Sequence, residues 1–359
     1  MRFGGPDPRH TCCDSRLLLK ALALNAASLP LSSRPDSGHG LGLDAGGTQT
    51  RWAVADASGA VQHQGQVVGI SALQLHHEAG RTAMTVALAE IAVAAGPVHA
   101  VVAGLTSFDA TQLPPLRELL AAAFAVEAHT VQAMSDIELA CHAAFAPGEG
   151  YVVVAGTGSI AAFIDAQGAL QRAGGRGAII DDAGGGHWIA RQALRHIWRA
   201  EDISPGAWQQ SPLARQVFER LGGSDWARTR QWVYGAGASR GEMGTLALAV
   251  AAAADEDPAA LAILQAAGTE LARLVVALQQ RFGTRPLALA GRVFELHPSI
   301  RARLQEALPA GMAVRRLMQA AQVEAARIAV TISVRTAVRT TVRTATPTTA
   351  STPTPKAAP

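Results

Sequence analysis

The sequence predicts an α/β protein of two domains, and two features support this prediction. Apolar runs typical of strands alternate with segments of helical spacing along the chain, which is the pattern of helices packed on a sheet. The same device also occurs twice, about a hundred residues apart, at 41–56 and at 151–164. In each case two short strands flank a corner of glycine and hydroxyl residues. This repetition indicates two domains that begin in the same way.

The first hairpin reads LGLDAGGTQTRWAVAD. In its corner Asp44 precedes Gly46 and Gly47, and Thr48 follows them. Paired glycines let the backbone approach a bound group and expose N–H donors that suit phosphate oxygens, while a carboxylate suits Mg²⁺. The alternative is an ordinary hairpin, in which glycine is present for its positive φ.

The rest of the first domain alternates strands and helices. A continuous apolar run at 98–103 is typical of a buried parallel strand, and Asp109 follows it. A carboxylate at the end of such a strand is a common ligand position, and the alternative is a cap for the next turn. The other elements that we expect here are strands at 61–68 and 131 and helices at 76–95, 114–125 and 136–145.

In the second domain the corner is Gly156-Thr157-Gly158-Ser159, and two further glycine clusters follow at 174–177 and 184–186. Glycine this dense costs conformational entropy and marks a place where the backbone meets a ligand. A helix predicted from 187 puts the second cluster where a helix N-terminus faces an anion. The later elements expected are helices at 211–221, 225–234, 240–254, 258–282, 295–307 and 323–330 and a strand at 287–290.

The two ends differ from the body in composition. Residues 1–38 lack periodicity and residues 331–359 consist of VRT-like triplets and a Thr/Pro/Ala tail, so we expect both to be disordered. Between them we place an N-terminal lobe at 39–134 and a C-terminal lobe at 135–330. In this division, the last helix of the second lobe can pack against the first lobe.

Charge and lysine content exclude two classes of protein. The net charge is +3, but the tail after Val330 carries four basic side chains and no acid, and the first 38 residues carry a net +2. The body is therefore about −3, which argues against a nucleic-acid surface. Lys20 and Lys356 are the two lysines, so a Walker A loop is excluded.

The cysteines and the lengths of the apolar runs indicate the cellular compartment. Cys12, Cys13 and Cys141 form neither a disulfide framework nor a metal-ligand spacing. Continuous apolar runs stay below the ~18–20 residues that span a bilayer. We therefore expect a reducing, cytoplasmic location and no membrane partner.

Five motifs resemble those of the BadF/BadG/BcrA/BcrD ATPase family, and they follow one another along the chain in the order found in that family. The resemblance is to its N-acetylglucosamine and glucosamine kinase branch, within the sugar kinase/actin/Hsp70-like superfamily. LDAGGTQT and AGTGS resemble the two phosphate motifs, and VAGLTSFD resembles the stretch with the catalytic carboxylate. GGRGAIIDDAGGGHWIARQAL resembles the sugar loop with its following helix, and LALAGRVF resembles the adenosine loop. The resemblance covers roughly residues 40–330. It implies a two-lobed, actin-like (ribonuclease H-like) ATPase fold with a ligand cleft between the lobes.

By this resemblance the chain is an ATP-dependent kinase that phosphorylates an amino sugar, N-acetylglucosamine or glucosamine, at its 6-hydroxyl. ATP and Mg²⁺ are the implied cofactors, and the sugar is the implied small-molecule partner. Whether the protein forms a homodimer is left undecided by the sequence. Asp44 would hold the metal and Asp109 would be the general base. The implied nucleotide residues are Gly46, Gly47, Thr48, Gly156, Thr157, Gly158, Ser159, Gly241 and Gly291, and the implied sugar residues are Asp109, Gly175, Arg176, Gly177 and Asp182.

Several roles stay open on the sequence alone. Asp182 binds sugar or caps the helix predicted from 187, and Asp181 competes for either role. Asp136 contributes to the metal site or caps its own helix. Arg292 stacks on adenine or reaches solvent.

The chain also departs from the family pattern. Ala183 replaces a Glu, Gly185 replaces a Ser, and Arg292 replaces a Gly, while Ala45 for Gly is mild. These changes keep a degenerate nucleotide-binding protein as an alternative. A second alternative is an ATPase that activates a dehydratase or reductase through an iron–sulfur cluster, but the body offers Cys141 alone as a ligand.

Overall fold

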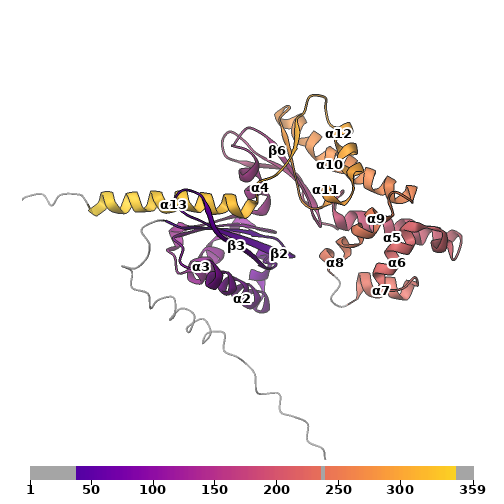
Figure 1. The fold of residues 1–359 in the computed structure, drawn as a ribbon, viewed down its shortest axis with the longest axis horizontal. Coiled ribbons are helices and arrows are strands. Elements are labelled where there is room, and N and C mark those ends of the chain that lie inside the picture. Colours follow the sequence, from indigo (N-terminus) through magenta and orange to yellow (C-terminus); the bar gives the residue numbers. More distant parts are fainter. Residues whose placement is uncertain (1–37, 236–238, 345–359) are drawn as a thin grey trace, which may run out of the picture.

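The structure, a computed structural model, describes residues 38–235 and 239–344. The predicted extension, apart from Gly38, and the last part of the predicted tail lie outside these residues. The predicted α/β class is confirmed, because the chain forms two five-stranded mixed sheets that are covered by helices (Figure 1).

The first sheet has the strand order β3-β2-β1-β4-β5. Strands β1 (Gly40–Ala45), β2 (Gln49–Ala55) and β3 (Val61–Val68) are antiparallel neighbours, as the hairpin pattern predicts. Strands β4 (Ala100–Leu105) and β5 (Val131–Ser135) run parallel to β1. On one face, α2 (Glu78–Ala95) and α3 (Leu113–Phe124) form a core with the sheet.

The other face of this sheet is covered by α13 (Ala321–Thr344), the helix nearest the C-terminus in Figure 1. Two glycines of β1 make this contact unusually close. A Cβ atom at Gly42 would lie 2.1 Å from the carbonyl oxygen of Gln322, and one at Gly40 would lie 2.5 Å from that of Ala326. The helix backbone therefore rests directly on the strand, with no side chain between them.

Helix α13 also corrects one expectation. It continues to Thr344, so for residues 331–344 the predicted disordered tail is wrong. Packing of Ala325, Ala326 and Ala329 on the sheet fixes the first turns of the helix, and once these turns exist each further residue adds a hydrogen bond without a new nucleation step. Composition alone does not show such an anchor.

The second sheet repeats the topology of the first, in the order β10-β9-β6-β7-β8. Strands β6 (Tyr151–Ala155), β7 (Ser159–Ile164) and β8 (Leu170–Gly174) are antiparallel neighbours. Strands β9 (Leu287–Ala290) and β10 (Val314–Arg316) run parallel to β6. The helices that share its larger core are α5 (Gly186–Ile203), α6 (Pro212–Leu221), α9 (Leu246–Ala253), α10 (Pro258–Phe282), α11 (Val293–Leu296) and α12 (Pro298–Ala307).

Helix α4 (Asp136–Ala144) lies between the two sheets. Its Leu139 packs with β4 and α13, whereas Ile137 and Cys141 pack with β6 and β7. The remaining elements are α7 (Trp226–Tyr234), α8 (Arg240–Gly244) and the short 3₁₀ helices η2 (Ala72–His76), η3 (Ala110–Gln112), η4 (Ala128–Thr130) and η5 (Ala207–Gln210).

Helix α10 is, within the described ranges, the one helix that is long and apolar enough to cross a membrane by length and composition. Leu264, Leu271 and Val275 are fully buried in the second core. The apolar character of α10 is that of a core helix.

Candidate functional site

The two glycine corners border the same short helix. The hydroxyl oxygen of Thr48 lies 3.5 Å from the position that a Cβ atom at Gly241 would take. The Cγ2 atom of Thr157 lies 3.6 Å from the corresponding position at Gly244. Gly241 and Gly244 are about one helical turn apart on α8. The corners of the two lobes therefore open onto one region of the molecule.

In each corner, neither the backbone conformation nor the packing of the described residues requires one of the glycines to be glycine. Neither Gly47 nor Gly156 adopts a positive φ. A Cβ atom at Gly47 would touch the Thr106 methyl group at 4.0 Å, and one at Gly156 would meet no described heavy atom within 4 Å. The ordinary-hairpin interpretation, in which these glycines supply a positive φ, is therefore wrong. Space beside exposed backbone is what an incoming phosphate requires.

Asp44 meets a second carboxylate at the edge of the first sheet. Strands β1, β4 and β5 are parallel neighbours, so Asp44, Thr106 and Asp136 follow one another at their carboxyl ends. Burial and then the neighbouring Asp136 carboxylate, opposed by Arg51, together raise the pKa of Asp44 to about 6. Burial also raises the pKa of Asp136, against hydrogen bonds from the Ile137 N–H and Thr106.

This pair of carboxylates fits a magnesium ion. The described residues contain no cluster of three or more His, Cys, Asp or Glu side chains that could enclose a metal, but Mg²⁺ keeps several waters and takes one or two carboxylates besides phosphate oxygens. Ser135, whose hydroxyl accepts from the Glu138 N–H at 3.3 Å, is the N-cap of α4. Asp136 is therefore not the cap, and its carboxylate lies beside Asp44.

We expect Asp44→Asn to raise the stability of the ligand-free protein while removing its activity. A raised pKa means that the folded state binds the proton more tightly than the unfolded chain, so the stabilisation is complete at low pH and is lost as the pH rises through about 6. The variant avoids this loss, which is about 2–3 kcal/mol near pH 8. Urea unfolding at about pH 8 should show the gain, and the same measurement at about pH 4 should show little difference. An equal gain at both pH values would contradict the assignment.

In the second corner, backbone hydrogen bonds join the loop to helix α5. The N–H groups of Gly186 and His187 donate to the carbonyl oxygens of Gly156 and Thr157 at 2.8 and 3.0 Å. Ser159 is buried, and its hydroxyl donates to the Ala183 carbonyl oxygen at 2.7 Å. The Ser159 hydroxyl thus bonds within the protein, whereas the sequence predicts it as a phosphate ligand.

Asp182 connects the second corner to the glycine loop at 174–177. Its Oδ1 accepts from the Gly177 N–H at 3.0 Å, and its Oδ2 lies 2.4 Å from where a Cβ atom at Gly158 would be. Asp182 is nearly buried and adopts a φ of 53°, which is a strained conformation for a residue other than glycine. Gly175 and Gly177 have positive φ, and Arg176 between them is exposed.

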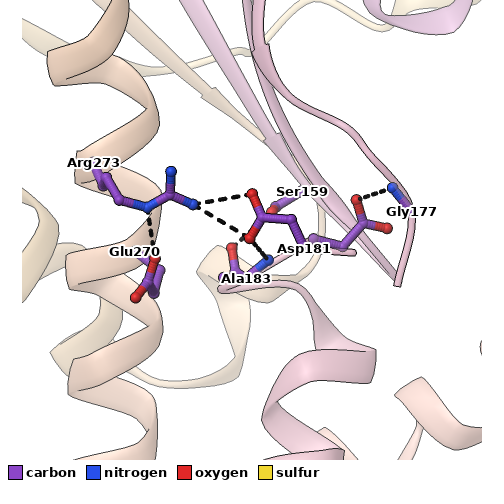
Figure 2. A network of polar contacts seen from close by, with 7 residues as sticks. Ser159, Gly177, Asp181, Ala183, Glu270 and Arg273 are labelled. Carbon is purple, nitrogen blue, oxygen red and sulfur yellow. Dashed lines mark hydrogen bonds and ion pairs between the residues drawn. The ribbon is translucent and has the colours of Figure 1, made fainter. Parts of the chain in front are cut away.

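Asp181 has a different role from Asp182, as Figure 2 shows. Its carboxylate accepts from the guanidinium of Arg273 at 3.1 Å and from the Ala183 N–H at 3.3 Å, and Arg273 also bonds Glu270. Gly185 occupies the N-cap position of α5, with no side-chain cap. Neither aspartate therefore caps α5. The carboxylate of Asp182 instead contacts the loop at 174–177 and lies next to Gly158.

Asp109 lies exposed at the start of η3. Its Oδ1 accepts from the N–H and the hydroxyl of Thr111 at 2.9 and 2.7 Å, so the cap interpretation is correct for this oxygen. These hydrogen bonds, and then Arg172 of the second lobe, lower the pKa of Asp109. The carboxylate is therefore ionised at neutral pH, as a proton acceptor must be.

Two further residues lie near Asp109. The positive charge of Arg172, on β8, lowers the pKa of Asp109. This edge strand of the second sheet therefore lies near the residues that follow β4. Ser107, two residues before Asp109, has a φ of 59°. Strained residues of this kind cluster at ligand sites. Neither residue is predicted from the sequence, because arginine and serine at such positions have no distinctive pattern.

Gly291 lies beside the second corner. With a φ of 97°, its Cβ position falls 2.2 Å from the carbonyl oxygen of Ala155, the residue before Gly156. Arg292 is exposed at the start of α11, in agreement with either of the roles open to it. Gly241 borders Thr48 instead, so the two predicted nucleotide glycines flank different corners.

Two cavities of the structure lie elsewhere. One of about 670 Å³ lies between α5 and α10 and includes Trp188 and Ile263, and one of about 380 Å³ lies between α10 and α12. No residue of the two corners lines either cavity. Cys141 is buried, which raises its pKa to about 12, so this thiol is an inert core group.

Two sheets of the same topology, each with a glycine corner that borders α8, are the arrangement of the actin-like ATPase fold. Comparison with known families agrees: the model of the BadF/BadG/BcrA/BcrD ATPase family matches residues 41–326. The chain belongs to this family. It matches no protein in a search of curated sequences.

Solved structures of the same fold include sugar kinases. A candidate N-acetylglucosamine kinase from Chromobacterium violaceum is 25% identical, with a TM-score of 0.63, over 83% of this chain and 100% of that one. One from Porphyromonas gingivalis is 19% identical, with a TM-score of 0.65, over 81% and 98% of the chains. A ROK-family glucokinase from Streptomyces griseus, in complex with glucose and AMPPNP, is 16% identical, with a TM-score of 0.51, over 81% and 99%.

Proposed function

We propose that the protein is a cytoplasmic, ATP-dependent kinase that phosphorylates an amino sugar, N-acetylglucosamine or glucosamine, at the 6-hydroxyl. The observation that supports this most is the pair of open glycines, Gly47 and Gly156, in corners that border one helix. Family membership supports ATP as the phosphoryl donor, and the names of the Chromobacterium and Porphyromonas proteins support an amino sugar.

Residues of both lobes would bind ATP and sugar. The backbone at Gly46, Gly47, Thr48 and residues 156–158 would hold the phosphates, and Asp44 with Asp136 would hold Mg²⁺, which neutralises phosphate charge. Asp182 and the loop at 175–177 would hold sugar hydroxyls. The ionised Asp109 would accept the proton of the 6-hydroxyl as its oxygen bonds to phosphorus. Closure of the lobes would exclude water from the phosphoryl group.

A coupled assay of ADP release over a panel of hexoses tests this function. We expect release to depend on N-acetylglucosamine or glucosamine and the phosphate to appear on the 6-oxygen, as judged by ³¹P NMR of the product. Release at one rate with and without sugar would instead support a sugar-independent ATPase. Nucleotide binding without turnover would support a degenerate member of the family, which the changes at Ala183 and Gly185 leave open.

A further inference from the structure

The two glycine corners offer N–H donors but no cation for a triphosphate. Both lysines, Lys20 and Lys356, fall outside the residues that the structure describes. Transfer of a phosphoryl group develops charge on its equatorial oxygens, which a positioned cation stabilises. Mg²⁺ at Asp44 and Asp136 would supply one such charge, and among the described side chains a second, permanently charged group must be an arginine.

Arg240 has the position that such a cation requires. It begins α8, and the next residue, Gly241, borders the Thr48 hydroxyl of the first corner. Its own guanidinium Nη1 lies 3.9 Å from where a Cβ atom at Gly177 would be. Gly177 belongs to the loop that Asp182 holds. Arg240 thus lies where the predicted phosphate corner meets the predicted sugar loop.

Within the part of the chain that the structure describes, the charge of Arg240 is not paired with a carboxylate. The nearby Glu242 is engaged in a capping box with Ser239. The ring of His187 is a titratable neighbour, and burial, then Arg191 and Arg240, lower its pKa against an opposing effect of Asp182. Among the described residues, no carboxylate therefore competes through an ion pair for the Arg240 guanidinium.

We propose that Arg240 binds the oxygens of the phosphoryl group during its transfer from ATP. This inference rests on the proposed function. The bond from the γ-phosphorus to the bridging oxygen of ADP breaks, the bond to the sugar oxygen forms, and Asp109 takes the hydroxyl proton. The guanidinium offers planar, paired donors to the phosphoryl oxygens throughout this step. Arg240 is thus a catalytic residue that matters more to the transition state than to bound ADP.

The test compares Arg240→Ala and Arg240→Lys with the wild type. Arg230→Ala is the matched control, because Arg230 is an exposed arginine on α7 without a contact to either corner. Calorimetry measures the affinity for MgADP with and without aluminium fluoride, which imitates the transferred group and needs no turnover. Steady-state kinetics measure kcat for transfer to sugar or, failing that, to water.

We expect Arg240→Ala to bind MgADP like the wild type but to lose the tighter binding that aluminium fluoride confers. Its kcat should fall about 10²–10³-fold, with partial recovery in Arg240→Lys and no loss in Arg230→Ala. An Arg240→Ala variant that keeps the fluoride effect, or that loses MgADP affinity to the same degree, overturns the proposal, as does a wild type without a fluoride effect. Sugar-independent turnover in the wild type refutes the sugar kinase alone, since the fluoride comparison still decides the role of Arg240.

Discussion

Asp109→Asn is expected to reduce sugar-dependent ADP release by about 10²–10⁴-fold, the usual contribution of a general base. The variant should keep its fold, because asparagine caps a helix start as well as aspartate and can still accept from the Thr111 N–H. The change therefore removes the proton acceptor and leaves the η3 turn in place. The measurement is kcat at saturating ATP and sugar, with circular dichroism as a check on folding.

Asp165→Asn is the matched control for this variant. Asp165 is partly exposed, caps the turn between β7 and β8, and has a pKa lowered by hydrogen bonds, first from the Ala169 N–H, as Asp109 does from Thr111. Its substitution should leave turnover unchanged. If both variants retain wild-type turnover, Asp109 is a cap and nothing more, and another group must accept the proton.

Gly42→Ala is expected to lower the free energy of unfolding by about 2 kcal/mol. The added Cβ atom would lie 2.1 Å from the Gln322 oxygen and 2.2 Å from the Ala326 nitrogen, both backbone atoms of α13. Helix and strand must therefore separate, at a cost greater than the 0.5–1 kcal/mol or so that alanine gains over glycine in a strand. Urea unfolding measures the difference.

Gly65→Ala provides the comparison. A Cβ atom at Gly65 would also come close to a neighbour, at 2.7 Å, but this neighbour is the ring of Trp52. A side chain next to an edge strand can turn away, whereas a helix backbone cannot, so the loss in Gly65→Ala should be clearly smaller. Equal losses in both variants would show that contact with α13 is not what makes Gly42 sensitive.

Local pattern was enough to predict the elements that hold the site. The hairpins at 41–56 and 151–164 were predicted because strand alternation and turn residues are local properties, and β1–β2 and β6–β7 confirm them. Strands β8 and β10 were missed. Both lie at a sheet edge and present partly exposed, arginine-bearing residues, so neither has the apolar pattern of a buried strand.

Predictions of long helices failed at short breaks. The helix expected at 240–254 is divided at Thr245 into α8 and α9, and the one expected at 295–307 is interrupted at His297. Pro298 begins α12, where proline fits the first turn. The first break allows Gly244 to lie against Thr157, a contact that depends on the tertiary fold.

The site itself could be predicted only in part. Motif order predicts roles for Asp44, the two corners and Asp182, and these stay predictions. Motif order does not say which carboxylate oxygen accepts a hydrogen bond or which arginine lies nearby. Arg172 and Arg240 enter the site because the two lobes meet. The relative placement of two lobes is a long-range property, which spacing in one sequence does not contain.

The position of α13 has a consequence for biosynthesis. The strands of the first lobe are translated early, yet the face that carries Gly40, Gly42 and Ala53 is covered by the last helix that the structure describes. While the ribosome is still making the second lobe, this face has no partner and is open to chaperones or to aggregation. Nascent chains arrested before residue 321 should therefore be held by a ribosome-associated chaperone, and a first lobe expressed by itself should be insoluble unless residues 321–333 are supplied.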